Sequence, residues 1–334
     1  MHGKKIKHGL VHAYFLYHYI CGSRILNYMP MNLMIEPTNM CNLKCRMCPQ
    51  DGLMTRKKGM MDFELYKRII DEAKNFVWCV QLFHTGESLL HPRLPEMIEY
   101  ARQAGMYTVL NTNACLLTKE RSSQLIKAGL SQISFSFDGP TQQAYEQIRV
   151  GASYIQVKSN IKDFIALKKQ QQARQPSTII EVIPMEETQV YLPDFLKELK
   201  SFGADDVRCW GYHEWTHNRS INNQYYPCEY PYSIMAVYWD GRVGPCCMDY
   251  DGKYIIGDIK EQSLSQIWNS LELQRLRAAF RDKSYSQIEL CRNCSFLTSP
   301  KTYISLSGKA FKILSGVVGK WVSSQNFKVY SAML

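Results

Sequence analysis

The sequence predicts an α/β protein built on a parallel sheet, followed by a smaller unit with a different pattern. Short apolar segments alternate with segments of helical periodicity through the first two thirds of the 334 residues. This alternation is the order of strand–helix–strand units. It stops near residue 212, and a segment rich in cysteine follows. Hydrophobic residues make up 46% of the chain, so we expect one large packed domain and one small one.

Six short apolar segments are predicted to form the parallel strands. They cover residues 32–36, 77–84, 107–110, 132–137, 178–184 and 206–210. Helical spacing lies between them at residues 61–75, 92–104, 118–128, 153–171 and 192–202. Thr118 is a suitable N-cap, and Gly105 and Gly129 each follow a predicted helix end. Six such units form three-quarters of a TIM-like barrel, a partial (β/α)6 barrel, with its active site at the carboxyl ends of the strands.

A compact α+β unit is predicted after the barrel. Strands at residues 234–239 and 242–246 are joined by a hairpin turn at Asp240-Gly241, and a helix covers residues 263–280. The chain therefore divides into a basic N-terminal extension (1–30), the barrel (31–215), a linker (216–227), the second unit (228–298) and a basic amphipathic tail (299–334).

Twelve cysteines occur in local groups, which is typical of metal binding in a reducing compartment and not of a disulfide framework. Cys41, Cys45 and Cys48 have the spacing C-x3-C-x2-C. Three thiolates can hold three irons of a [4Fe–4S] cluster and leave the fourth iron open to a small molecule. The alternative is structural zinc, which usually takes four ligands in pairs, and no fourth ligand lies nearby in the sequence.

The segment 38–49 around these cysteines resembles the signature of the radical S-adenosylmethionine (radical SAM) enzymes. In that family the open iron binds SAM, and reductive cleavage of SAM gives a 5′-deoxyadenosyl radical that abstracts hydrogen from the substrate. The resemblance extends over residues 31–298. It implies that SAM is contacted by Met47, Gly86, Glu87, Asn113, Ser136, Asp138 and Arg149.

Three strand ends carry motifs similar to those of the family. His84-Thr85-Gly86-Glu87-Ser88 resembles Gly-Gly-Glu-Pro, with Thr85 and Ser88 as departures. Residues 111–113 resemble Thr-Asn-Gly, and residues 134–139 resemble Ser-x-Asp-Gly. By the same resemblance Arg149 pairs with the SAM carboxylate, which a guanidinium fork suits well. Without that context, an ordinary turn and a surface salt bridge are the alternatives.

A second group of cysteines lies in the small unit: Cys228, Cys246, Cys291 and Cys294, separated by 18, 45 and 3 residues. Four thiolates fit one fully ligated [4Fe–4S] cluster or one zinc ion. The segments 239–246 and 291–294 resemble the SPASM/Twitch auxiliary-cluster domains, and four cysteines match the shorter, one-cluster Twitch form. Cys247 is an alternative to Cys246, which is favoured because it follows the proline.

The whole arrangement is similar to the butirosin-pathway cyclitol dehydrogenase of the same superfamily. It implies an oxidoreductase that dehydrogenates an alcohol or sugar, with the auxiliary cluster as electron acceptor. It also implies a small-molecule substrate, sugar-like or lipid-linked, and an electron donor such as flavodoxin or ferredoxin, with no nucleic acid as partner. The general base is unassigned; weak candidates are Arg208, Tyr212, His213 and Asp249. A structural role is favoured for His84, His213 and His217.

Two other functions remain open. A peptide- or protein-modifying maturase, of the sulfatase-maturing or thioether-forming type, would share the same core. Many peptide maturases carry a separate leader-binding domain, for which the 30 residues before the barrel are too few. A non-catalytic zinc scaffold is the third reading, and it predicts a colourless protein.

The net charge of +10 is concentrated at the two ends of the chain. Residues 1–35 contain four basic side chains and residues 291–334 contain six, with no acid in either segment. A nucleic-acid enzyme more often carries its basic patch around the active site. Residues 309–322 are amphipathic, as in an interfacial helix or a helix docked on the barrel. With no signal peptide or membrane span in the sequence, we expect a cytoplasmic protein, with peripheral contact at the inner membrane face as a further hypothesis.

Overall fold

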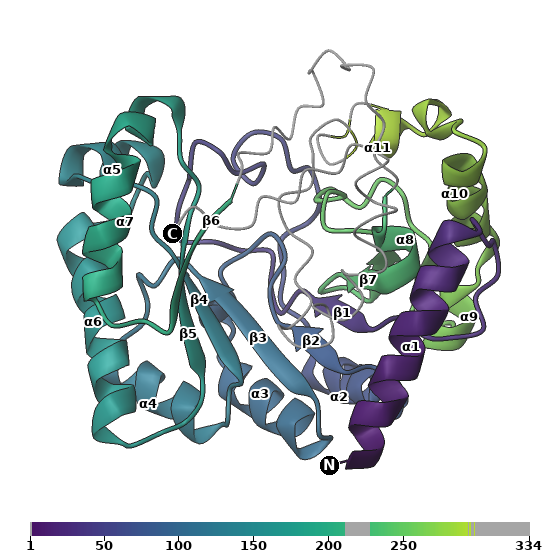
Figure 1. The fold of residues 1–334 in the computed structure, drawn as a ribbon, viewed down its shortest axis with the longest axis horizontal. Coiled ribbons are helices and arrows are strands. Elements are labelled where there is room, and N and C mark those ends of the chain that lie inside the picture. Colours follow the sequence, from purple (N-terminus) through teal and green to yellow (C-terminus); the bar gives the residue numbers. More distant parts are fainter. Residues whose placement is uncertain (1, 211–227, 293, 295–296, 298–334) are drawn as a thin grey trace.

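The computed structural model describes residues 2–210 and 228–292, together with Cys294 and Leu297. Its strands are β1 (Asn32–Ile35), β2 (Cys79–Gln81), β3 (Tyr107–Thr112), β4 (Gln132–Ser136), β5 (Ser177–Val182), β6 (Asp206–Cys209), β7 (Ile234–Val237), β8 (Arg242–Gly244) and β9 (Gly257–Asp258). They form one sheet in the order β6-β5-β4-β3-β2-β1-β7-β8-β9 (Figure 1). Strands β1 to β7 pair in parallel, whereas β8 and β9 pair antiparallel.

The α-helices are α1 (His2–Ile20), α2 (Phe63–Ala73), α3 (Leu94–Gln103), α4 (Lys119–Lys127), α5 (Gln142–Ile148), α6 (Tyr154–Gln170), α7 (Leu192–Ser201), α8 (Tyr230–Ser233), α9 (Leu264–Trp268), α10 (Leu271–Arg281) and α11 (Glu289–Arg292). Short 3-10 turns cover Ser88–Leu90, Glu186–Tyr191 and Tyr285–Gln287. Helices α2 to α7 follow the sheet on its outer side (Figure 1). The partial barrel and the small α+β unit are therefore confirmed.

The barrel helices each bury one face, and α2, α4 and α6 begin at side-chain caps. Asp62 accepts hydrogen bonds from the backbone of the first turn of α2, and Thr118 and Ser153 do the same for α4 and α6. The inner face of α2 buries Tyr66 completely, and its hydroxyl donates to the Met97 carbonyl at 2.8 Å. These helices close the outer side of the sheet and leave the carboxyl ends of the strands to form a site.

The structure differs from the prediction at one predicted helix and adds a barrel helix that was not predicted. The single helix expected at residues 263–280 is two helices, α9 and α10, so that prediction was wrong. Ser270 caps the start of α10 by accepting from the Leu273 amide, and the Asn269 side chain bonds the backbone of Leu26. Helix α5 was not predicted, because seven residues give too short a period to recognise.

The first strand of the small unit continues the barrel sheet. β7 pairs with β1 in parallel over four residues, from Asn32–Ile234 to Ile35–Val237. The carboxyl end of β7 therefore lies beside the carboxyl end of β1, where the first cysteine loop begins. Helix α1 covers the small unit, with Tyr19 against Tyr232 at 5.6 Å between ring centroids. Among the described residues, no helix combines the length and the hydropathy that a membrane crossing requires.

One buried arginine ties the small unit together. Arg277 on α10 is fully buried, and its guanidinium donates to the carbonyls of Pro231, Arg24 and Trp268. Burial lowers the pKa of Arg277 to about 10. Four carbonyl and amide oxygens take the place of water around this cation, since Asn269 also accepts from it.

Candidate functional site

The first cysteine group lies on the loop that leaves β1. This loop is held against the end of α5, because the Lys44 amide donates to the Val150 carbonyl and the Arg46 amide to that of Ile148. Leu43, Met47 and Ile148 form a small buried cluster against which Cys41 and Cys48 pack, and Cys45 belongs to it. The loop therefore holds three thiols in one place at the carboxyl edge of the sheet.

Burial of these thiols disfavours their thiolate form. It raises the pKa of Cys41 to about 12, and it raises the pKa values of Cys45 and Cys48 as well. The three sulfurs also raise one another's pKa by mutual repulsion. Three thiolates at this position need a bound cationic group, and a [4Fe–4S] cluster supplies one.

Glycine is required at the strand end that faces this loop. A Cβ atom on Gly86 would overlap the carbonyl oxygens of Thr38 and Met40. The next residue, Glu87, is buried, and its amide donates to the Met40 carbonyl at 2.8 Å. The end of β2 and the cysteine loop are thus packed backbone to backbone.

The Glu87 carboxylate joins the ends of β2 and β3. It accepts from the Thr112 hydroxyl at 2.8 Å, from the Asn113 amide at 2.8 Å and from the Leu89 amide at 3.0 Å. Burial raises the pKa of Glu87. Both carboxylate oxygens have partners within the protein, so Glu87 organises the strand ends.

Arg149 is the nearest cation to the first cysteine group. Its Nε donates to Asp138 at 2.6 Å, and one terminal nitrogen lies 3.8 Å from the Cys45 sulfur. Asp138 is buried and also accepts from the Ile183 amide at 2.7 Å. Burial alone would lower the pKa of Arg149, but Asp138 and Cys45 raise it overall, so the guanidinium stays charged. The structure thus places two predicted SAM contacts, Asp138 and Arg149, together beside the cysteines.

The other predicted contacts divide into two places. Asn113 lies at the cysteine loop, where its amide donates to Asn42 at 2.9 Å and lies 3.8 Å from the Cys41 sulfur. Ser136 lies farther along the strand ends and donates to Asn111, which in turn donates to Glu181 at 2.9 Å.

Glu181 was missed from the sequence. It is a carboxylate on β5 whose pKa is raised by burial, with Ser134 and Asn111 as hydrogen-bond partners and the charge of Arg208 nearby. Its alternation with buried apolar residues of the strand was the available signal.

A buried polar network occupies the ends of β1, β2 and β7, and the sequence did not predict it. Arg56 and Glu36 form a two-pronged ion pair, with N–O distances of 2.9 and 2.8 Å. The Thr85 hydroxyl donates to Glu36 at 2.6 Å, and His84 Nδ1 lies 2.9 Å from the Thr85 hydroxyl. The backbone amide of Trp239, just beyond β7, donates to Glu36 as well. This network links the barrel to the small unit.

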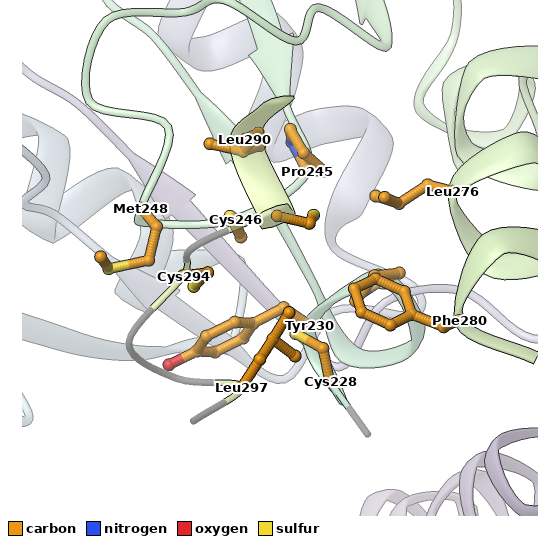
Figure 2. A pocket seen from close by; sticks show the side chains of 12 residues that line it. Cys228, Tyr230, Pro245, Cys246, Met248, Leu276, Phe280, Leu290, Cys294 and Leu297 are labelled. Atoms are coloured by element: carbon orange, nitrogen blue, oxygen red, sulfur yellow. The ribbon is translucent and has the colours of Figure 1, made fainter. Parts of the chain in front are cut away.

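The second cysteine group lines one cavity of the small unit. Cys228, Cys246 and Cys294 point toward this cavity, which is otherwise walled by apolar side chains such as Leu276, Phe280 and Leu290 (Figure 2). Cys291 completes the lining. Burial raises the pKa of Cys246 far above its usual value, and the charges of the neighbouring cysteine sulfurs raise it further. Four thiols that line one apolar cavity fit a fully ligated iron–sulfur cluster.

The structure distinguishes the two adjacent cysteines by what they contact. Cys246 lines the cavity, whereas the Cys247 side chain forms a hydrogen bond with Tyr230 and packs beside Met34 and Ile234. No three His, Cys, Asp or Glu side chains in the described ranges are grouped closely enough to hold one metal ion.

The structure describes two of the four base candidates, Asp249 and Arg208. Asp249 is buried, and its carboxylate accepts from the amides of Lys253 and Tyr254 at 2.8 and 2.9 Å. Arg208 pairs with Asp206 at 2.7 Å. Tyr212 and His213 lie outside the described residues, as do His217, the predicted linker and the amphipathic segment 309–322.

Comparison with known families agrees with this geometry. Residues 35–205, half of the chain, match the Radical SAM superfamily, and residues 228–295 match the SPASM iron–sulfur cluster-binding domain. These two segments contain the first and the second cysteine group, respectively.

Several characterised proteins are similar to this chain. The tungsten-containing aldehyde ferredoxin oxidoreductase cofactor-modifying protein of Pyrococcus furiosus is 26% identical, over 79% of this chain and 86% of that protein. The S-adenosyl-L-methionine-dependent 2-deoxy-scyllo-inosamine dehydrogenase of Niallia circulans is 24% identical, over 78% of this chain and 91% of that protein. PqqA peptide cyclase of Bradyrhizobium diazoefficiens is 32% identical, over 33% of this chain and 29% of that protein.

A solved structure shares the fold. The crystal structure of BtrN in complex with AdoMet and 2-DOIA superimposes with a TM-score of 0.61 at 18% sequence identity. It covers 83% of this chain and 98% of that one.

Proposed function

Because this chain belongs to the radical SAM superfamily, we propose that it oxidises an alcohol carbon of a sugar- or cyclitol-type molecule. The cofactors of this family and of its SPASM domain are SAM, a [4Fe–4S] cluster and an auxiliary iron–sulfur cluster. When bound, they supply a 5′-deoxyadenosyl radical and a one-electron acceptor. Cys41, Cys45 and Cys48 would hold the first cluster, and the four cysteines of the cavity would hold the second.

The observation that carries this proposal is the closed second centre. All four of its thiols line one cavity whose remaining walls are apolar. A cluster held by four protein thiolates changes charge without exchanging a ligand, which suits an electron acceptor better than a substrate ligand. The overall similarity to a SAM-dependent cyclitol dehydrogenase supports the same reaction class.

The residues around the first centre would bind and orient SAM. Arg149, held by Asp138 beside Cys45, offers a guanidinium to the SAM carboxylate. Gly86 leaves the space between β2 and the cysteine loop free of a side chain. Asn113, next to the Cys41 sulfur, supplies an amide donor or acceptor at the same place.

The proposal is tested with protein reconstituted anaerobically with iron and sulfide, a chemical reductant and SAM. Expected products with 2-deoxy-scyllo-inosamine or a related cyclitol as probe are equal amounts of 5′-deoxyadenosine and a ketone. The Cys228→Ala variant should still form 5′-deoxyadenosine and lose the ketone. Ketone formation at the unmodified rate by that variant would contradict the electron-acceptor role.

Peptide modification is the competing function, because a peptide cyclase is among the similar proteins. It would be favoured if no polyol in the panel were oxidised and if a peptide encoded beside this chain were modified instead.

The same assay decides between a flavodoxin and a ferredoxin as the natural electron donor, by replacing the chemical reductant with each protein in turn.

We also propose that the enzyme contacts an anionic membrane through α1. Four of the eleven large hydrophobic side chains that are exposed in the described chain lie within twelve residues of this helix and its end: Tyr14, Tyr17, Ile20 and Ile25. Residues 1–25 of the sequence carry Lys4, Lys5, Lys7 and Arg24 and no acid. Tyrosine and isoleucine beside lysine are the composition of an interfacial helix. The tail at 299–334 is basic as well, so like charge disfavours it as the cover of α1.

Sedimentation with vesicles tests this contact. The protein should sediment with phosphatidylcholine–phosphatidylglycerol vesicles at low salt and stay in solution with phosphatidylcholine alone. The double variant Tyr14→Ser/Tyr17→Ser should lose binding. Val190→Ser/Tyr191→Ser, which removes an exposed apolar pair elsewhere, should keep it. Equal binding by both variants would show that α1 is not the contact.

A further inference from the structure

The ends of β1, β2 and β7 hold a histidine whose surroundings suit a proton acceptor. We propose that His84 Nε2 takes the hydroxyl proton of the substrate in the oxidation proposed above, on which this assignment rests. Glu36, Thr85 and Arg56 would act as positioning residues that hold the imidazole in the accepting tautomer.

The hydrogen-bond count around Thr85 determines that tautomer. The Thr85 hydroxyl has one hydrogen, which it donates to Glu36 at 2.6 Å, and it accepts from Arg56 at 3.0 Å. Its 2.9 Å contact with His84 Nδ1 must then have Nδ1–H as the donor. The same nitrogen lies 3.3 Å from the Glu36 carboxylate, which also requires a donor. Nδ1 therefore carries a hydrogen, and in the neutral ring the lone pair is on Nε2.

Nε2 has no hydrogen-bond partner among the described residues, although the ring is buried. Only 2% of the His84 side chain is exposed. A buried polar atom without a partner costs about 1–3 kcal/mol. His18 Nδ1 is another such atom in the described chain, but at His84 the other ring nitrogen faces a carboxylate. A substrate hydroxyl donating to this nitrogen would complete its hydrogen bonding.

The position of His84 lies between the two cysteine groups. His84 lies in the segment that follows β2. It stands two residues before Gly86, which packs against the first cysteine loop. On its other side the ring of Tyr238 lies at 5.4 Å, edge to face. The Tyr238 hydroxyl lies against Gly244, two residues before Cys246 of the second group. A substrate that gives a hydrogen atom on one side and an electron on the other has to lie in this region.

The charges of the network suit a proton acceptor. Burial alone would raise the pKa of Glu36, but hydrogen bonds from Arg56 and His84 lower it overall, so the carboxylate is ionised. Arg56 neutralises it in the resting state and lies over the Tyr238 ring at 4.3 Å. When Nε2 takes a proton, Glu36 is in place to stabilise the imidazolium, as a carboxylate behind a catalytic histidine does.

The proposed step balances as follows. The hydrogen atom of the carbinol C–H bond goes to the 5′-deoxyadenosyl radical and gives 5′-deoxyadenosine. The O–H bond breaks, its proton goes to His84 Nε2, and the C=O bond forms. The one electron left over goes to the oxidised auxiliary [4Fe–4S] cluster. The substrate is thus oxidised by two electrons, one lost with the hydrogen atom and one to the cluster.

The variant His84→Asn tests the assignment, because its amide nitrogen takes the place of Nδ1 but nothing replaces Nε2. With 2-deoxy-scyllo-inosamine as probe, ketone formation should fall by about 10²-fold or more, the usual contribution of a general base. 5′-Deoxyadenosine should still form, so its ratio to ketone should rise well above one. The control His18→Asn changes another buried histidine, whose Nε2 lies 2.8 Å from Asn27 Oδ1. This variant should keep the ratio at one.

A second measurement needs no turnover. In oxidised holoprotein labelled with ¹⁵N at histidine rings, the signal missing from His84→Asn should have the shifts of a neutral ring protonated at Nδ1. An Nε2–H tautomer would overturn the assignment. So would an unchanged ratio of products in a His84→Asn variant of an enzyme that does oxidise the probe. If the unmodified enzyme oxidises no alcohol at all, the proposed function fails first, and the base assignment with it.

Discussion

The two cysteine groups of this protein differ in almost every respect except chemistry. The first has three thiols on one short loop, with Arg149 and Asn113 beside the sulfurs. The second has four thiols from three separate segments, in a cavity otherwise walled by apolar side chains. A guanidinium and an amide lie beside the first group, whereas apolar side chains line the cavity of the second. This difference agrees with the proposed roles, SAM binding at the first group and electron acceptance at the second. The side chains beside the sulfurs thus determine how open each cysteine group is to a further ligand.

Removing the first group should have the largest effect. In the triple variant Cys41→Ala/Cys45→Ala/Cys48→Ala, we expect no 5′-deoxyadenosine from SAM, because no other described group could hold the open cluster. Anaerobic Mössbauer spectra should show loss of about half of the cluster iron, if each group holds one [4Fe–4S] cluster. Spectra matching those of the unmodified protein would contradict the difference drawn between the two groups.

The second group offers a matched pair of adjacent cysteines. Cys246→Ala should lose the iron of the second cluster and the ketone product while SAM cleavage continues, because Cys246 lines the cavity. Cys247→Ala should keep both iron and product, because Cys247 contacts Tyr230 instead. Iron analysis and product ratios distinguish the two variants, and the reverse result would exchange their roles.

Glu36 contacts both the barrel and the small unit, through Arg56 and Trp239, so its replacement should lower the stability of the protein. Glu36→Gln leaves Arg56 buried without its charge partner, and we expect a loss of about 3–5 kcal/mol in the free energy of unfolding. Asp71→Asn, which breaks an exposed pair with Lys74, should cost less than about 1 kcal/mol.

The Glu36 effect should depend on pH. The pKa of Glu36 is lowered in the folded protein, so its stabilising contribution is fully present at neutral pH and is lost as pH falls below the ordinary carboxyl range, through the folded pKa. Denaturant titrations of Glu36→Gln and the unmodified protein at neutral and at acid pH would measure this. A difference between the two proteins that stays constant toward acid pH would exclude an ionised Glu36.

Arg149 should give the smallest of these effects. Arg149→Lys keeps the charge near Cys45 but loses the fork that reaches both Asp138 and a carboxylate ligand. Loss of one charged hydrogen bond of about 1.5–3 kcal/mol should raise the dissociation constant of SAM by roughly ten- to a hundredfold. Calorimetric titration with SAM measures it, and unchanged affinity would place the SAM carboxylate elsewhere.

Much of the fold could be predicted because it depends on local pattern. Alternating apolar and helical segments indicated β1 to β6, and Thr118 and Ser153 cap helices close to the predicted starts. The break between α9 and α10 was missed although Ser270 is a local N-cap signal. The bond from Asn269 to Leu26, a residue 243 positions away, could not be predicted. The pairing of β7 with β1 is equally non-local, and it brings Trp239 to Glu36.

The candidate site divides in the same way. Spacing indicated the first cysteine group and the C-x2-C pair of the second, because those cysteines are close in the sequence. Cys228 and Cys246 were predicted from the resemblance of their surroundings to SPASM/Twitch domains. The His84–Glu36–Arg56 network was not foreseen, and a structural role was favoured for His84. These three residues are 20 to 48 positions apart and come together only at the ends of three strands.

The sequence by itself determined the cofactor class of this protein, because thiols at short spacing bind a cluster wherever the loop that carries them lies. The tertiary structure alone decided which groups surround each set of thiols. It did so because burial and hydrogen bonding are properties of neighbours brought together by parallel strand pairing. That pairing places a cation beside one set of sulfurs and an apolar wall around the other. At the ends of β1, β2 and β7 it leaves a histidine nitrogen that has no hydrogen-bond partner in the described part of the chain.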